Sequence, residues 1–371
     1  MKLEAIELRT LHLPLVRPFR TSFGTEVARE ALVVRVLGDE GEGWGECVAG
    51  SEPRYSSEFV AGSWLVIRDH LAPALLAADD ISAGAVGGLL GGFGGHKMAK
   101  ASLEMAVLDA ELKERGESFQ QFLGGSGDSV APGVSVGITG DVAQLLDVVS
   151  AHLEEGYTRV KLKIEPGFDL EPVTAVRKLV GDDFMLQVDA NTAYTRADFD
   201  HLARLDELGL LLVEQPLDEE DLLGHAALAR RLTTPICLDE SILSATTAAT
   251  ALELGACSIV NIKAGRVGGY LEARRVHDLC RSAGVPVWCG GMLETGLGRA
   301  ANLALATLPG FTLPGDISAT RRYFTEDVTE PFELEHGRIR VPTGKGLGVT
   351  VDEDALGRLT VHRELVTAGA A

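Results

Sequence analysis

The stretch Thr158-Arg159-Val160-Lys161-Leu162-Lys163-Ile164 begins a pattern that repeats to about Asp316. Apolar runs of strand length end in a charged residue at five positions, which are Lys163, Asp189, Glu214, Asp239 and Lys263. Successive positions are 26, 25, 25 and 24 residues apart. A strand, a loop and a helix together occupy about that many residues, so we expect each position to end one of a series of parallel strands.

This repeat predicts an α/β fold with a (β/α)7-8 barrel of the TIM type over residues 131–318. In such a barrel the carboxyl ends of the strands meet on one face, and active sites lie on that face. The five charged residues should therefore converge. The strands are expected at 133–137, 159–164, 185–189, 210–214, 236–239, 259–263, 285–289 and 312–315.

Residues 1–130 predict a separate α+β capping domain, in which antiparallel strands precede helices. Between its first two strands, the Pro- and Gly-bounded segment 17–25 reads as a loop. It is either a substrate lid or an ordinary surface loop. Residues 319–371 are too few to fold alone and are expected to return to the capping domain, with residues 367–371 disordered.

Composition excludes some classes of partner. The 371 residues carry 34 Lys and Arg against 54 Asp and Glu, a net charge of −20 that argues against nucleic acids and anionic membrane surfaces. We find neither a signal peptide nor an apolar run long enough to cross a membrane. The five cysteines are scattered without a C-x-x-C motif, which favours free, buried thiols in a reducing cytoplasm.

The three central positions, Asp189, Glu214 and Asp239, suggest a metal site. A single acidic residue at a strand end is usually a helix cap or a salt-bridge partner. Three at matched positions favour a shared cation, and carboxylate oxygens suit Mg²⁺ or Mn²⁺ better than zinc. A zinc hydrolase would need histidines at the strand ends, and these are missing.

Lys161 and Lys163 are two residues apart on one predicted strand, so their side chains share a face. We expect that inward face to be otherwise apolar, where idle ammonium groups would be costly. The charge of Lys161 should lower the pKa of Lys163, as a general base requires. Lys263 should face it across the barrel. A metal bound to a substrate carboxylate acidifies the adjacent C–H bond, and lysines on its two sides can remove and return that proton.

Several sequence motifs indicate which protein family this chain resembles. They resemble those of the o-succinylbenzoate synthase / N-succinylamino acid racemase group, in the muconate-lactonizing-enzyme branch of the enolase superfamily. The likeness covers essentially the whole chain. The motifs are Lys161–Lys163, Asp189–Asn191, Glu214–Pro216, Asp239–Ser241, Asn261–Lys263, Pro18–Gly24, Gly265–Gly269 and Trp288–Gly296.

This resemblance implies dehydration of 2-succinyl-6-hydroxy-2,4-cyclohexadiene-1-carboxylate to 2-succinylbenzoate, through an enediolate, in menaquinone biosynthesis. Lys163 would be the base, Lys263 would stabilise the enediolate, and Lys161 would support Lys163. With an N-succinylamino acid, Lys163 and Lys263 would be the two bases of a racemase. The resemblance also implies Mg²⁺, with Mn²⁺ or Co²⁺ as substitutes, and a cytoplasmic homo-oligomer, either a dimer or an octamer.

Residues beside the ligands and at other strand ends, together with the loop that the resemblance implicates, are expected to contact substrate or orient the ligands. Gln215 and Glu240 are expected to orient the carboxylates or lysines, unless they make only ordinary loop hydrogen bonds. Glu294, Asp316 and Ser318 either bind the distal end of the substrate or cap helices. The residues expected to bind substrate are Phe19, Arg20, Ser22, Phe23, Tyr55, Ser135, Asn191, Gly291, Met292 and Leu293.

Two alternatives remain open at this point. The first keeps the proton transfer but changes the task, to a dedicated N-acylamino acid racemase or, further away, a dipeptide epimerase or a cycloisomerase. The second is a non-catalytic barrel that binds a ligand or serves as a scaffold. A non-catalytic barrel should have lost a lysine or a carboxylate, whereas all six are present.

Overall fold

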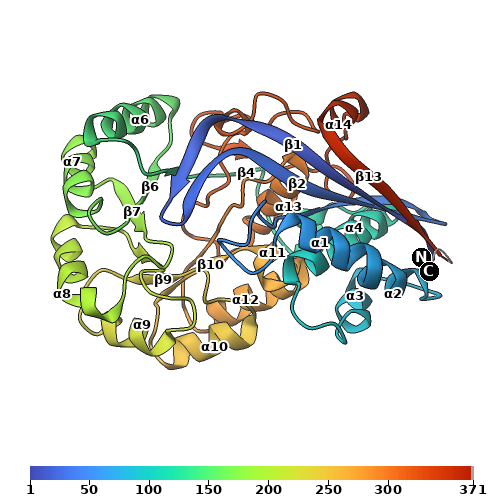
Figure 1. The fold of residues 1–371 in the computed structure, drawn as a ribbon, viewed down its shortest axis with the longest axis horizontal. Helices are drawn as coiled ribbons and strands as arrows, with labels where there is room; N and C mark the ends of the chain where they lie inside the picture. Colours follow the sequence, from blue (N-terminus) through green and yellow to red (C-terminus); the bar gives the residue numbers. More distant parts are fainter. Residues whose placement is uncertain (369–371) are drawn as a thin grey trace.

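A computed structural model describes residues 1–368 of the chain. Its N-terminal part is a four-stranded antiparallel sheet of order β13-β1-β2-β3. The two longest strands form a hairpin that leaves the sheet and reaches over the barrel, while both chain ends lie at the opposite end of the sheet (Figure 1). The sheet strands are β1 (Leu3–Thr21), β2 (Gly24–Gly38), β3 (Gly41–Cys47) and β13 (Thr360–Thr367).

Helices cover one face of this sheet, and the longest, α4, packs directly on β3. A Cβ atom on Gly43 would lie 2.0 Å from the carbonyl oxygen of Ala106, and one on Gly45 would lie 2.0 Å from that of Ser102. Only glycine permits so close an approach of strand and helix. The helices are α1 (Val60–Val66), η1 (Ile67–Leu71), α2 (Ala72–Leu76), α3 (Ala83–Leu89), α4 (Lys97–Arg115) and α5 (Phe119–Leu123).

The predicted parallel barrel is present as a seven-stranded sheet of order β11-β10-β9-β8-β7-β6-β5, with helices along its outer side (Figure 1). Its strands are β5 (Val134–Val136), β6 (Arg159–Lys163), β7 (Met185–Asp189), β8 (Val213–Glu214), β9 (Ile236–Leu238), β10 (Ile259–Ile262) and β11 (Val287–Cys289). The intervening helices are α6 (Val142–Glu155), α7 (Leu170–Val180), η2 (Arg196–Asp198), α8 (Phe199–Leu202), η3 (Ala203–Leu208), α9 (Leu222–Ala229), α10 (Ala245–Glu253), α11 (Ala264–Val267), α12 (Tyr270–Ser282) and α13 (Gly296–Leu305).

The eighth strand expected at 312–315 is not formed, and the barrel closes through single backbone contacts instead. The amide of Gly133 donates to the carbonyl of Gly315, and the amide of Asp316 donates to that of Cys289. Pro314 has no N–H to add to a ladder, which explains why the segment bridges its neighbours without becoming a strand.

Other boundaries also differ from the predictions. Strands β9 and β10 end one residue early, so Asp239 and Lys263 are the first residues beyond them. The segment 17–25, expected as a loop, is mostly strand, because β1 continues to Thr21 and β2 starts at Gly24. Of the tail expected to be disordered, Thr367 is the last residue of β13, and residues 369–371 lie outside the described part.

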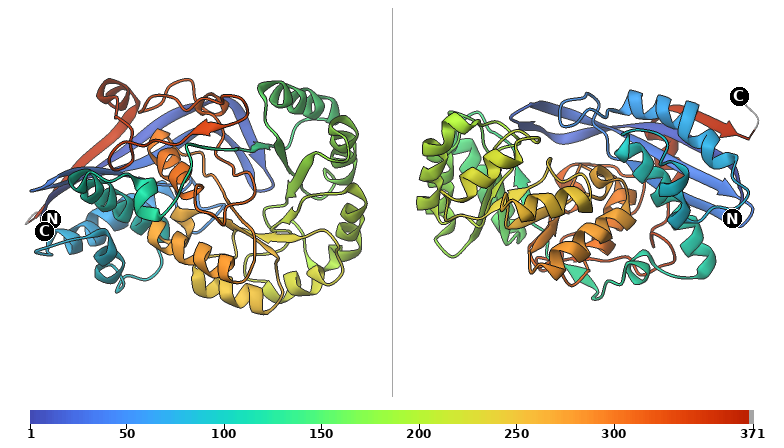
Figure 2. Two further views of the ribbon diagram at one scale, coloured as in Figure 1. Left: turned by 180° about the vertical axis from the view of Figure 1, so that it is seen from behind. Right: turned by 90° about the horizontal axis from the view of Figure 1, so that it is seen from below.

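The remaining elements link barrel and sheet. They are β4 (Ser129–Val130), η4 (Thr320–Arg322), β12 (Ile339–Arg340) and α14 (Glu353–Leu359). Through β13, the C-terminal segment adds a strand beside β1 at the edge of the N-terminal sheet. Figure 2 shows the β1–β2 hairpin lying across one face of the barrel. Among residues 1–368, no helix is both long and apolar enough to span a membrane.

Candidate active site

Alternation along β6 directs Arg159, Lys161 and Lys163 into the barrel, and all three are buried. The Nζ atom of Lys161 lies 2.6 Å from Asp316 Oδ2, 2.9 Å from Glu214 Oε2 and 3.0 Å from Asp189 Oδ2. Burial opposes its charge, but these carboxylates outweigh burial and raise the pKa of Lys161. Lys161 is therefore a fixed cation.

The expectation that this inward face is otherwise apolar is wrong. Arg159 shares the face, and its guanidinium lies 5.3 Å from the ring centre of Trp288, while the ammonium of Lys161 lies 4.8 Å from it. The charges are tolerated because carboxylates and an aromatic face surround them.

Lys163 ends β6 and lies at the base of a cavity. Its Nζ atom is 2.6 Å from Asp189 Oδ2 and 2.6 Å from Asn191 Oδ1. Burial lowers the pKa of Lys163, Asp189 opposes this shift, and Lys161 adds to it. The sequence predicted the direction correctly but named the smaller cause, since burial acts more strongly than the charge of Lys161.

Lys263 approaches from the other side of the barrel, as the first residue beyond β10. Its Nζ atom lies 2.8 Å from Asp239 Oδ2 and donates to the hydroxyl of Tyr55 at 3.0 Å. Burial works to lower its pKa, but Tyr55 and Glu240 raise the pKa of Lys263 overall. The two lysines thus have opposite tendencies, and each is paired with a different carboxylate.

The three carboxylates occupy neighbouring strand ends. Asp189 and Glu214 are register partners on β7 and β8, and Asp239 follows β9 directly. Burial works to raise the pKa of Asp189, but Lys163 and Lys161 hold it well below its usual range. Burial and the neighbouring Asp189 raise the pKa of Glu214. The negative charge of these buried carboxylates is therefore stabilised by the nearby lysines.

This donor set fits a hard divalent cation, which is the group that the family of motifs implies. Two further buried oxygens beside the carboxylates, Glu240 Oε2 and Asn261 Oδ1, have no hydrogen-bond partner in the described structure. Within residues 1–368 no group of three or more Asp, Glu, His or Cys side chains already converges on one point. The carboxylate oxygens are instead directed at the lysines and at Arg266.

Gln215 and Glu240 hold the parts of the site together. The Oε1 atom of Gln215 accepts from the amide of Asp239 at 3.0 Å, and its Nε2 donates to Ser241 Oγ at 2.8 Å. Glu240 Oε1 accepts from Asn191 Nδ2 at 2.8 Å. Asn191 in turn contacts Lys163, so these two residues connect the ligands with a lysine.

Backbone strain collects at the same face. Among the described residues, six non-glycine residues have positive φ, and four of them follow barrel strands. Such conformations cost energy and are retained where the surroundings impose them, which is frequent at functional sites. The four are Asn191 (φ 41°), Thr192 (φ 65°), Gln215 (φ 36°) and Leu293 (φ 56°).

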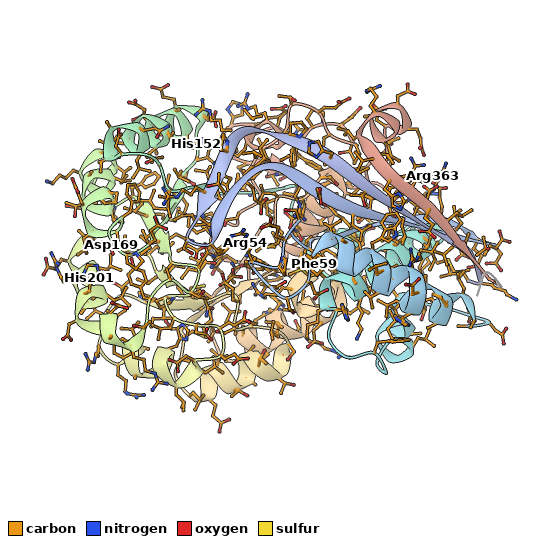
Figure 3. All side chains as sticks on the ribbon, in the orientation of Figure 1. Arg54, Phe59, His152, Asp169, His201 and Arg363 are labelled. Atoms are coloured by element: carbon orange, nitrogen blue, oxygen red, sulfur yellow. The ribbon has the colours of Figure 1, made fainter. Side chains whose placement is uncertain are left out.

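A cavity of about 410 Å³ lies between the barrel face and the β1–β2 hairpin. The barrel supplies the two lysines Lys163 and Lys263, and the hairpin forms the opposite wall. In Figure 3, Arg54 lies beside the hairpin tip, and its guanidinium donates to the carbonyl of Phe23 at 3.2 Å. Arg54 was not among the predicted substrate residues. Those that do line the cavity are Phe19, Phe23, Tyr55, Asn191, Gly291, Met292 and Leu293.

Three predicted substrate residues lie elsewhere. Arg20 is exposed on the other side of the hairpin, where it pairs with Glu165 at 2.7 Å. Ser22 Oγ donates to the carbonyl of Asn191 at 3.2 Å and only braces the hairpin tip. Ser135 lines a smaller neighbouring cavity of about 40 Å³, which Lys161 and Lys163 also reach.

Two residues with important contacts were missed or given another role. Arg266 donates to Asp239 Oδ1 and, at 3.0 Å, to the hydroxyl of Tyr55. Its position three residues after Lys263, one helical turn away, was the available signal. Asp316 was expected to bind the distal end of the substrate or to cap a helix, but it forms ion pairs with Lys161 and Arg159.

Comparisons with known proteins agree with this geometry. Residues 5–124 match the family model described as mandelate racemase / muconate lactonizing enzyme, N-terminal domain, and residues 144–355 match the model described as enolase C-terminal domain-like. An N-succinylamino acid racemase from Amycolatopsis sp is 63% identical, over 98% of this chain and 99% of its own. An o-succinylbenzoate synthase from Geobacillus stearothermophilus is 47% identical, over 97% and 96%.

Comparison with solved structures indicates the same superfamily. The crystal structure of an enolase-superfamily member from Listeria innocua matches with a TM-score of 0.94 at 39% identity and covers 99% of both chains. Family models match both parts of the chain, and the relatives align over nearly its full length. The chain therefore belongs to the mandelate racemase / muconate lactonizing enzyme family of the enolase superfamily.

Proposed function

We propose that this chain is a Mg²⁺-dependent o-succinylbenzoate synthase with N-succinylamino acid racemase activity. The observation that carries the proposal is that Lys163 and Lys263 line one cavity, each paired with a different buried carboxylate. Relatives with these two names align over nearly the whole chain. Their identity to this chain supports related substrates, and the two lysines supply the proton transfer that both reactions share.

Asp189, Glu214 and Asp239 would hold the Mg²⁺, with Mn²⁺ or Co²⁺ as substitutes. When bound, the ion supplies positive charge that makes the C–H bond beside a substrate carboxylate more acidic. The partnerless oxygens of Glu240 and Asn261 support a cation at this place. Lys161 adds a fixed positive charge below the site.

For dehydration, Lys163 removes the proton from the ring carbon that carries the carboxylate. The hydroxyl on the adjacent ring carbon leaves as the new C=C bond forms. Lys163 returns the proton to that hydroxide, so one water is released and the ring becomes aromatic. Lys263 stabilises the negative charge that develops on the substrate.

For racemisation, one lysine removes the α-proton and the other delivers a proton to the opposite face of the same carbon. Nothing is oxidised or reduced, and the two enantiomers interconvert. Lys163 and Lys263 reach the cavity from strands β6 and β10, on different sides of the barrel. This arrangement supports a two-base mechanism.

Residues 131–318 form the barrel in this proposal, while residues 1–130 and 319–371 form a cap that covers the substrate. Phe19, Phe23, Tyr55 and the segment 291–293 would contact it, and Ser135 would act from the smaller neighbouring cavity. Arg20 and Ser22 would only hold the hairpin in place, through Glu165 and the carbonyl of Asn191. We place the enzyme in the cytoplasm, in menaquinone synthesis, as a homo-oligomer, either a dimer or an octamer, with a small carboxylate as substrate.

A dedicated N-acylamino acid racemase is the second candidate. It is favoured by the Amycolatopsis racemase, which at 63% identity resembles this chain more than the Geobacillus synthase at 47%. The chemistry at the lysines is the same in both proposals. Only the preferred substrate differs.

The test offers the purified protein both substrates in the presence of Mg²⁺. Dehydration is followed by loss of the diene absorbance, and racemisation of N-succinylphenylalanine by polarimetry. Formation of 2-succinylbenzoate supports the first proposal. Racemisation without dehydration selects the second candidate, and turnover of neither substrate overturns both.

A further inference from the structure

Arg29 occupies a position where the strand pattern calls for an apolar residue. It lies on β2, where Ala31 and Val33 follow at alternate positions on the same face, and both are fully buried. Its partner on β1 is Leu13, which is also buried. Arg29 thus ends an apolar row near the hairpin tip with a guanidinium group.

This guanidinium is buried and unpaired. Arg29 is 2% exposed, and its Nε and Nη2 atoms have no hydrogen-bond partner in the described structure. No carboxylate of residues 1–368 lies within ion-pairing distance of it. The charge of Arg29 lowers the pKa of the Glu46 carboxyl, but less strongly than burial, Thr295 and Glu294 act on it.

A buried charge without a partner is costly, and buried donors are normally satisfied. Arginine is also the side chain best suited to hold a carboxylate through two parallel hydrogen bonds. Arg29 lines the same cavity of about 410 Å³ as Lys163 and Lys263. A cavity of this size accommodates a small organic ligand. The missing partner can therefore be part of a bound substrate.

We propose that Arg29 binds the remote carboxylate of a dicarboxylate substrate, at the far end of a succinyl-type acyl chain. This inference rests on the proposed function, in which the near carboxylate lies at the lysines. The remote carboxylate would bind on the hairpin wall of the cavity, so that one substrate contacts both the barrel and the cap. Arg29 would then select acidic acyl groups over neutral ones.

The test compares two substrates that differ only at the remote end, N-succinylphenylalanine and N-butanoylphenylalanine, in which a methyl group replaces the carboxylate. In Arg29→Met, kcat/KM for racemisation of the succinyl compound should fall about 30-fold, the range of a charged hydrogen bond, mainly through KM. The butanoyl compound should change by less than about 3-fold. Arg29→Lys should keep part of the preference.

Arg35→Met is the matched control. Arg35 lies on the same strand but pairs with Glu42 and stacks on Trp44, away from the cavity. The ratio of kcat/KM for the two substrates should stay unchanged in this variant. An equal loss for both substrates in Arg29→Met, or no loss for either, would overturn the proposal.

A second measurement does not depend on turnover and separates this inference from the proposed function. Succinate should raise the Tm of the wild-type protein more than butyrate does, and Arg29→Met should abolish that difference. If the wild type racemises neither substrate but still shows the difference, the proposed function fails and Arg29 remains a carboxylate site. A succinate shift that persists in Arg29→Met would overturn the role of Arg29.

Discussion

The Nζ atom of Lys163 lies 2.6 Å from Oδ2 of Asp189, its register partner on the neighbouring strand β7. The pairing of two parallel strands thus brings a lysine and a carboxylate together at one end of the barrel. Lys263 and Asp239, each the first residue beyond its strand, form a similar ion pair at 2.8 Å on the other side, although they are not register partners. Both contacts follow from the position of the residues at the ends of their strands.

Lys163→Ala should abolish dehydration and racemisation together. Removing a general base costs about 10²- to 10⁴-fold in rate, and we expect at least that loss in kcat for both substrates. Circular dichroism should show an unchanged fold. Lys178→Ala, which alters an exposed lysine on α7, is the control and should retain full activity. Comparable turnover in the two variants would refute the role of Lys163.

Lys263→Ala should remove proton transfer on one face of the substrate α-carbon and leave it on the other. Racemisation should fall by about 10²-fold or more, because one of the two bases is missing. Lys163 remains, so the α-proton of one enantiomer should still exchange with deuterium from the solvent. Mass spectrometry of each enantiomer in D₂O measures this exchange. Equal exchange of both enantiomers in the variant would contradict the two-base account.

Glu214→Gln should weaken Mg²⁺ binding, because an amide is a poorer ligand than a carboxylate and Glu214 lies between the other two acids. Isothermal titration should show a rise in Kd of about 10-fold or more, comparable to the loss when groups that support a metal are changed. The exposed Glu253→Gln on α10 serves as the control. Identical Mg²⁺ affinity in both variants would exclude Glu214 as a ligand.

Glu46, a buried carboxyl outside the lysine site, should make the stability of the fold depend on pH. Burial raises the pKa of this carboxyl from 4.5 to about 7, although it accepts hydrogen bonds from Thr295 and Gly298. Between these values the unfolded chain releases the proton while the folded chain keeps it, so stability falls as pH rises and the loss is complete above about pH 7. The full penalty is about 3 kcal/mol.

Glu46→Gln removes this titration. The free energy of unfolding, measured with urea at about pH 5 and pH 8, should fall less with pH in the variant than in the wild type, by about 3 kcal/mol. The comparison within each protein cancels any constant cost of the substitution. Parallel pH profiles for the two proteins would show that Glu46 titrates normally.

The five cysteines, all buried as free thiols, should not react in the folded protein. Burial raises the pKa of Cys47 to about 12, so the reactive thiolate is scarce. A thiol reagent should label no cysteine under native conditions and all five after unfolding in denaturant. Rapid labelling of the native protein would show that one thiol is accessible.

The sequence predicted the barrel and the convergence of its charged strand-end residues because both depend on a local rule. Strand β7 was expected at residues 185–189 and has those bounds, since its apolar run ends at the charge of Asp189. The spacing of the charged residues then placed them on one face. Both the strands and the common face of the charged residues could be predicted from the alternation of strand and helix along the chain alone.

Features that depend on distant contacts were not predicted. The hairpin around Pro18 read as a loop, because Pro and Gly mark turns locally, yet β1 and β2 stay paired near the tip. Arg20 was therefore placed in the site, although its strand position directs it to Glu165. The unformed eighth strand follows from Pro314 and could have been inferred. Arg29 could also have been noticed, as a charged residue at the end of the apolar row that Ala31 and Val33 form on β2.

The two functions are best separated by kcat/KM of the wild-type protein with Mg²⁺ for the cyclohexadiene carboxylate, set beside that for N-succinylphenylalanine. We expect a dehydration value in the usual enzymatic range of about 10⁴–10⁸ M⁻¹s⁻¹, together with measurable racemisation. Efficient racemisation alone would keep the lysine mechanism and make the protein a dedicated racemase. Turnover of neither substrate would show that the protein is neither an o-succinylbenzoate synthase nor an N-succinylamino acid racemase.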